Sequence, residues 1–173
     1  MTAGLLVLVV GPSGAGKDTV LNYAHARLSG NPRFVFPRRV ITRPPGPGED
    51  HEPVTEQAFS ARRFALAWAA HGLHYGVPER IEADLAAGKI VVVNVSRGVS
   101  AEAARKYRCK IVEIAAPATV LAARLAARRR EAAGDIAARL ARVAPGYQAD
   151  AIIMNDSTIE AAGEAFLAEL MRG

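Results

Sequence analysis

The chain has 173 residues, half of them hydrophobic, with 22 Lys and Arg against 17 Asp and Glu and a formal net charge of +5. This length fits one domain with a full core, the basic balance suits anionic ligands such as phosphates, and the single cysteine excludes an internal disulfide. Few aromatic residues accompany the arginines and no apolar run is long enough to cross a membrane, so we expect a cytoplasmic protein with no nucleic-acid or membrane partner.

Hydrophobic periodicity predicts strands that alternate with helices along the chain. Strands are expected at about 4–10, 34–42, 89–95, 110–115 and 151–154, and helices at about 17–29, 57–71, 78–87, 98–106, 117–143 and 157–171. The runs at 5–10 and 90–93 are apolar at every position, as in central parallel strands that helices cover on both faces. This order predicts an α/β fold with three α/β/α layers around a central parallel sheet.

A phosphate-binding loop of the P-loop type follows the first predicted strand. Its residues are Gly11, Pro12, Ser13, Gly14, Ala15, Gly16, Lys17 and Asp18. Backbone N–H groups of such a loop, the positive end of the following helix and the lysine together hold the β- and γ-phosphates of a nucleotide such as ATP. We expect Thr19, the next residue, to reach the α-phosphate.

Asp18 stands where the usual motif has Ser or Thr, whose hydroxyl binds Mg²⁺. A carboxylate beside phosphates repels them unless a cation lies between the two. We therefore expect Asp18 to bind Mg²⁺, either directly or through a water molecule.

A second informative stretch, residues 38–52, begins by alternating strand-forming residues with arginines. At the two-residue period of a strand, Arg39, Ile41 and Arg43 share one face, so both guanidinium groups can converge on one phosphate-bearing ligand. The alternative is a solvated edge strand that leads into a Pro/Gly turn.

A third stretch, residues 71–78, has two glycines around an aromatic residue, which is typical of a tight turn. Tyr75 in this turn presents a hydroxyl that can donate a hydrogen bond to an acceptor phosphate. The alternative is a tyrosine that caps the edge of the core.

Polar residues follow two of the predicted strands directly. Asn94 and Ser96 come after the third strand, and Asn155 and Asp156 come after the last one. Because ligands of parallel α/β folds bind at the carboxyl ends of the strands, we expect these residues in one crevice with the phosphate-binding loop.

The order of these motifs resembles the guanylate kinase superfamily from end to end. The resemblance implies one kinase domain over 1–173, with a core of about 1–33, 88–125 and 145–173, an acceptor-binding region of about 34–87 and an arginine-rich lid of about 126–144. It also implies that Asn155 lies near the adenine, although capping of the last helix by Asp156 or Ser157 explains that neighbourhood as well. In the lid, Arg128 and Arg139, with Arg130 as a further candidate, are implied to close over ATP; the alternative is ordinary solvated arginines.

The residues that read guanine in that superfamily are absent. Arg39 stands where it has a serine, and Leu66 where it has a glutamate that pairs with the base. Gly46 stands where that superfamily has a phosphate-binding arginine, and Thr55 where it has a phosphate-binding tyrosine. Since leucine accepts no hydrogen bond, guanine loses the contacts that select it.

The segments 11–18, 41–43, 48–51, 68–77 and 93–97 resemble the ribose 1,5-bisphosphate phosphokinase family, which also has Lys-Asp at the end of its loop. The resemblance implies that ATP and Mg²⁺ convert ribose 1,5-bisphosphate, a phosphorylated sugar of phosphonate degradation, to 5-phosphoribosyl 1-diphosphate (PRPP). Lys17, Arg128 and Arg139 are then the implied catalytic residues. The implied acceptor-binding residues are Arg39, Arg43, Tyr75, Asn94 and Ser96.

Two residues of this pattern, His51 and Trp68, receive no role, and Trp68 is expected in the core.

A phosphate-monoester nucleophile is already largely deprotonated at neutral pH, because its second pKa is about 6, so the reaction needs no general base. Two alternatives stay open: another small-molecule kinase or a nucleoside monophosphate kinase, including a divergent guanylate kinase, or else a non-catalytic guanylate kinase-like binding module. Lys17 and the arginine-rich lid argue against the module, and no oligomeric state is predicted.

Overall fold

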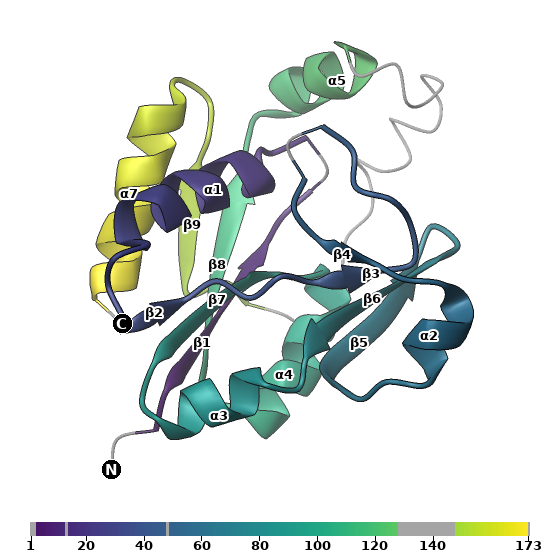
Figure 1. Cartoon of the computed structure of the whole chain (residues 1–173). Coiled ribbons are helices and arrows are strands. Elements are labelled where there is room, and N and C mark those ends of the chain that lie inside the picture. Colours follow the sequence, from purple (N-terminus) through teal and green to yellow (C-terminus); the bar gives the residue numbers. More distant parts are fainter. Residues whose placement is uncertain (1–2, 13, 48, 128–147, 173) are drawn as a thin grey trace.

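The computed structural model describes residues 3–12, 14–47, 49–127 and 148–172. Within these ranges a five-stranded parallel sheet has the order β2-β7-β1-β8-β9 (Figure 1). Its strands are β1 (Leu5–Val10), β2 (Phe34–Val35), β7 (Ile90–Asn94), β8 (Cys109–Ala115) and β9 (Ala151–Met154).

Helices cover both faces of this sheet, because alternate residues of the apolar strands point to opposite sides. From β1, Leu5, Val7 and Val9 pack with α1 (Lys17–Leu28) and α7 (Ile159–Met171). The intervening residues of β1 pack on the other face with α3 (Ile81–Ala86) and α4 (Ser100–Lys106), which the 3₁₀ turn Arg97–Val99 precedes. The predicted three-layer α/β/α architecture is confirmed, and α5 (Ala118–Ala127) follows β8.

A second, four-stranded sheet lies beside the first (Figure 1). It has the order β4-β3-β6-β5, made of β3 (Val40–Ile41), β4 (Glu52–Pro53), β5 (Phe64–Ala70) and β6 (Leu73–Pro78), and it carries the short helix α2 (Glu56–Ser60). Strand β6 pairs antiparallel with both β3 and β5. This sheet falls within the region expected to bind the acceptor.

The predicted helix over 57–71 is wrong. The helix ends at Ser60, and residues 64–70 form β5, which pairs antiparallel with β6. The alanine-rich segment favours a helix by local propensity, but the pairing with β6 and the burial of Ala65 and Leu66 outweigh that preference.

Three neighbouring expectations also need correction. Residues 73–78 form β6 rather than a tight turn; the chain reverses at His71 and Gly72, whose φ angles are 55° and 73°. The helix expected at 78 begins at Ile81, because Pro78 still belongs to β6. The strand expected over 34–42 divides into β2 and β3 in different sheets, with Pro37, which lacks a backbone N–H, between them.

None of the helices in the described ranges has the length and apolar composition that crossing a bilayer requires.

Candidate functional site

The loop between β1 and α1 has the backbone geometry of a phosphate cradle. Gly11, Gly14 and Gly16 have φ angles of 147°, 86° and 89°, which side-chain-bearing residues rarely adopt. A Cβ at Gly16 would lie 2.4 Å from Nδ2 of Asn155, so the loop also needs glycine there for space. Pro12 and Ala15 belong to this loop, whereas Ser13 lies outside the described residues.

Two side chains far along the sequence brace this loop. Arg124 of α5 donates from Nη1 to the Gly14 carbonyl at 3.0 Å and from Nη2 to the Asn155 carbonyl at 3.0 Å. The buried amide of Asn155, just after β9, donates to the Ala15 carbonyl at 2.8 Å. Asn155 therefore lies against the loop, and its role near the adenine stays a prediction. Sequence reasoning missed the brace by Arg124, because its contact with the Gly14 carbonyl spans 110 residues and no local motif predicts it.

We expect Arg124→Ala to weaken both the loop and nucleotide binding. The variant removes the guanidinium donor from the carbonyls of Gly14 and Asn155, and hydrogen bonds to charged groups contribute about 1.5–3 kcal/mol to stability. Urea unfolding and titration with an ATP analogue measure the two losses. Arg105→Ala on α4, an exposed arginine, is the matched control and should change neither. Equal stability and equal nucleotide affinity of the two variants would contradict a bracing role for Arg124.

Asp18 and Asn94 meet where α1 begins and β7 ends. The exposed Asp18 accepts a hydrogen bond on Oδ1 from Nδ2 of the buried Asn94 at 2.9 Å. Beside them, Nζ of Lys17 donates to the Gly11 carbonyl at 2.7 Å. Thr19 is exposed on the first turn of α1, and Ser96 is exposed where the 3₁₀ turn begins. The expected crevice at the strand ends thus contains the loop, Asp18 and Asn94.

A cleft extends from this point between α1, the end of β7 and residues 36–51. Asp18, Arg39, Glu49, His51 and Asn94 all line it. The cleft therefore runs from the start of α1 to residues 36–39 and 49–51, which directly precede β3 and β4. A site for an acceptor next to a bound nucleotide requires such a position beside the loop.

Arg39 is a partly buried cation in this cleft. Burial lowers the pKa of Arg39, and the nearby Asp18 carboxylate raises it in part. In the described ranges, its guanidinium forms no hydrogen bond or ion pair; it lies over the Tyr75 ring, 5.9 Å from the centroid. Withdrawing a charge from water without a paired anion is unfavourable, so this group is suited to an anionic ligand.

The structure brings Tyr75 to Arg39 through the second sheet. The ring of Tyr75 on β6 stacks on Trp68 of β5, its cross-strand partner, with centroids 5.5 Å apart and planes 4° apart. Trp68 packs against the core, as expected, but from a strand rather than a helix and only partly buried. The strand face predicted to hold Arg39 and Arg43 does not form, because β3 spans only Val40–Ile41 and the two arginines lie on either side of it.

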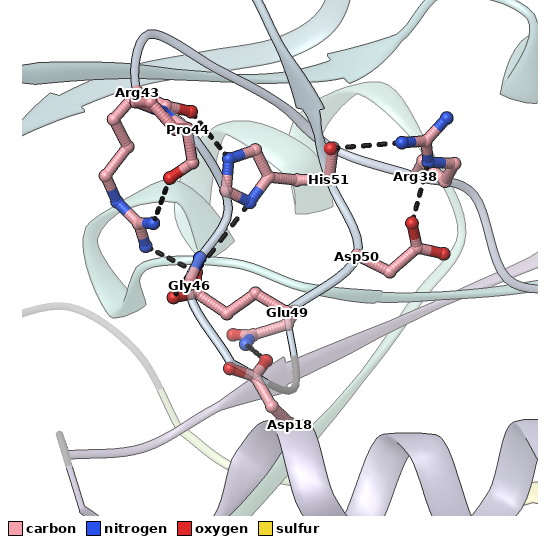
Figure 2. A network of polar contacts seen from close by, with 9 residues as sticks. Asp18, Arg38, Arg43, Pro44, Gly46, Glu49, Asp50 and His51 are labelled. Carbon is pink, nitrogen blue, oxygen red and sulfur yellow. Dashed lines mark hydrogen bonds and ion pairs between the residues drawn. The ribbon is translucent and has the colours of Figure 1, made fainter.

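Arg43 belongs to a polar network with Glu49 and His51 (Figure 2). Its Nη2 pairs with Oε2 of Glu49, whose other oxygen accepts the Gly46 N–H at 3.2 Å. This hydrogen bond to Glu49 raises the pKa of Arg43, against the effect of burial. Burial alone raises the pKa of Glu49, but the Arg43 hydrogen bond and charge outweigh it and leave the pKa below its usual value. Sequence reasoning matched Glu49 to a family pattern without giving it a role.

The remaining predicted residues lie outside the described part of the chain. Arg128, Arg130 and Arg139, and with them most of the lid, fall in 128–147. In the part of the chain that the structure describes, no three His, Cys, Asp or Glu side chains gather closely enough to hold a metal ion by themselves.

Comparisons with known proteins identify close relatives. The chain is 61% identical over 170 residues to ribose 1,5-bisphosphate phosphokinase PhnN of Acidiphilium cryptum, covering 98% of this chain and 94% of the relative. It is 51% identical to the protein of the same name from Methylobacterium radiotolerans, covering 96% of this chain and 97% of that one. A bifunctional ribose 1,5-bisphosphokinase-thymidine phosphorylase of Cupriavidus pinatubonensis is 47% identical over 99% of this chain and 30% of its own length.

The fold also has a counterpart among solved structures. A guanylate kinase from Anaplasma phagocytophilum superposes with a TM-score of 0.72 over 99% of this chain and 86% of that one, at 19% identity. This similarity confirms the guanylate kinase-like fold and, at this identity, the fold alone. A comparison with protein-family models finds no match.

Proposed function

The chain belongs to the ribose 1,5-bisphosphate phosphokinase family, and we propose that it transfers the γ-phosphoryl group of ATP to the 1-phosphate of ribose 1,5-bisphosphate. The products are ADP and 5-phospho-α-D-ribose 1-diphosphate. The observation that carries this substrate is the Arg39 guanidinium, which lies in the cleft beside the phosphate-binding loop and has no hydrogen bond or ion pair among the described residues. Leu66, at the position of the base-reading glutamate, is 1% exposed in the core and offers a base no hydrogen bond.

The residues of the site bind and neutralise charge rather than transfer protons. An oxygen of the acceptor's 1-phosphate attacks the γ-phosphorus, and the bond from that phosphorus to the leaving oxygen of ADP breaks. The attacking phosphate is largely dianionic at neutral pH, so no side chain has to remove a proton. Lys17 holds the β- and γ-phosphates, and Arg39, Arg43 and Tyr75 hold the acceptor in line with them.

The residues at the start of α1 fit a magnesium ion. Asp18 is exposed directly after Lys17, and Asn94 occupies only one of its carboxylate oxygens. Asp18 would hold the ion, which when bound neutralises charge on the transferring phosphoryl group.

We expect Asp18→Asn to weaken magnesium use selectively. The amide keeps the size of the side chain but loses the charge, so the Mg²⁺ concentration needed for half-maximal rate should rise about tenfold or more. Rates measured over a magnesium titration test this. Glu160→Gln, an exposed carboxylate in the first turn of α7, is the matched control. An unchanged magnesium dependence in Asp18→Asn would remove Asp18 from the metal site.

The proposed reaction is tested by ADP release from Mg·ATP, with ribose 1,5-bisphosphate and GMP assayed side by side. We expect turnover with the sugar bisphosphate and little with GMP. Strong turnover of GMP alone would overturn the proposal in favour of a nucleoside monophosphate kinase, and negligible nucleotide affinity would indicate a binding module.

A further inference from the structure

His51 is a buried histidine with one uncompensated ring nitrogen. Only 3% of the residue is exposed, and Nε2 lies 2.8 Å from the Arg43 carbonyl. Because a carbonyl oxygen only accepts, Nε2 carries the proton of the neutral ring. Within the described ranges, Nδ1 has no hydrogen-bond partner, and it lies 3.7 Å from Oε2 of Glu49 (Figure 2). In the neutral ring, a lone pair therefore faces a carboxylate.

The Glu49 carboxylate stands between the guanidinium of Arg43 and the ring of His51. Oε2 pairs with the guanidinium of Arg43 and lies next to Nδ1 of His51. Its side chain is 15% exposed, so water screens these contacts only partly. In the proposed function Arg43 also binds an acceptor phosphate, which means that Glu49 and the phosphate compete for one guanidinium.

We propose that His51 is a positioning residue that resolves this competition. A proton taken from solvent onto Nδ1 gives Glu49 a second charged donor, so that the Arg43 guanidinium is released to bind the acceptor phosphate. The ring stays anchored meanwhile, because Nε2 still donates to the Arg43 carbonyl. The inference rests on the proposed function and assigns this protein an acceptor affinity that is linked to protonation of His51.

The charges around His51 set the direction of this linkage. Glu49 favours the proton, and the cations Arg43 and Arg39 oppose it; Arg38, which pairs with Asp50, donates to the His51 carbonyl. From α1, Asp18 and His25 line the same cleft. A bound phosphate adds negative charge and takes Arg43 from Glu49, and both changes favour the protonated ring. Acceptor binding should therefore take up a proton and should tighten as the pH falls.

The test uses His51→Gln, because a glutamine amide can keep the donor to the Arg43 carbonyl but offers nothing at Nδ1. The KM for ribose 1,5-bisphosphate and the kcat are measured from about pH 8 to about pH 6, the interval in which imidazole titrates. The ionisation of the substrate changes the KM of both proteins in the same way, so it cancels in the ratio of variant to native KM. We expect this ratio to rise about tenfold towards low pH with kcat unchanged, since a charge-assisted hydrogen bond contributes on this scale.

Two further variants make the result specific. His74→Gln, an exposed histidine on β6, should give a flat ratio near one. In a Glu49→Gln background, His51→Gln should change the pH dependence no further, because the two residues act through one contact. If His51→Gln folds poorly, the proton uptake of the native protein on acceptor binding, measured by calorimetry in two buffers and compared with Glu49→Gln, tests the same linkage.

The outcomes separate this inference from the proposed function. No turnover of ribose 1,5-bisphosphate by the native protein would overturn the function itself. Native turnover with a pH-independent KM ratio would overturn the role of His51 alone. If His51→Gln lowers kcat and thermal stability and raises KM to the same extent at every pH, His51 is only a structural residue.

Discussion

Replacing Lys17 by methionine is expected to lower kcat by about 10²–10³-fold, as the loss of a preorganised donor does elsewhere. Its ammonium group lies at the mouth of the loop, where Nζ donates to the Gly11 carbonyl at 2.7 Å. The charge that develops on the transferring phosphoryl group would lose this cation. Methionine keeps the length of the apolar stem, so packing should change little.

The kcat of Lys17→Met is read from ADP release at saturating ATP and acceptor, with thermal unfolding as the check on folding. Lys89→Met is the matched control, because Lys89 pairs with Asp84 just before β7 begins, at the end of that strand away from the cleft. A Lys17 variant with nearly native kcat would remove this residue from the transfer step.

Replacing Arg39 by methionine is expected to raise the KM for ribose 1,5-bisphosphate about 10–100-fold with a smaller change in the KM for ATP. A hydrogen bond to a charged group contributes about 1.5–3 kcal/mol, which corresponds to this range. The stability of the variant should be unchanged or higher, because in the described ranges Arg39 has no ion pair or hydrogen bond to lose and its burial is unfavourable.

Weaker acceptor binding together with unchanged or higher stability distinguishes a binding arginine from a structural one, whose loss lowers stability. Steady-state kinetics with each substrate varied, together with urea unfolding, measure both. Arg63→Met, an exposed arginine outside this cleft, should leave both unchanged. A destabilised Arg39 variant with a native acceptor KM would contradict its assignment to the ligand.

The strongest predictions from the sequence concern segments whose local pattern has one structural solution. The uninterrupted apolar runs at 5–10 and 90–93 lead to central parallel strands, since only burial on both faces suits them. The loop from Gly11 to Asp18 is equally specific, because its glycines meet a backbone requirement and its lysine follows at a fixed spacing. Asn94 was placed correctly in the crevice by the rule that ligands meet parallel strands at their carboxyl ends.

The failures concern segments whose structure depends on a distant partner. Residues 64–70 have helical propensity, and only β6, which pairs with them, makes them a strand. Nothing in the local sequence assigns a contact to Arg124, and only the fold places its guanidinium on the carbonyl of Gly14. Glu49 and His51 belonged to a matched pattern, but their joint contact with Arg43 is a property of the folded segment 43–51.

By itself the sequence determined the α/β class, the phosphate-binding loop and the loss of the guanine-reading residues, because each depends on residue type and short spacing. Only the tertiary structure decided which cleft cation has no ion pair within the described ranges, which side chains brace the loop and which carboxylate holds Arg43. The physical reason is that hydrogen bonding and burial act through space. A side chain such as Arg39 or His51 acquires its chemical role from neighbours that the chain order does not place beside it.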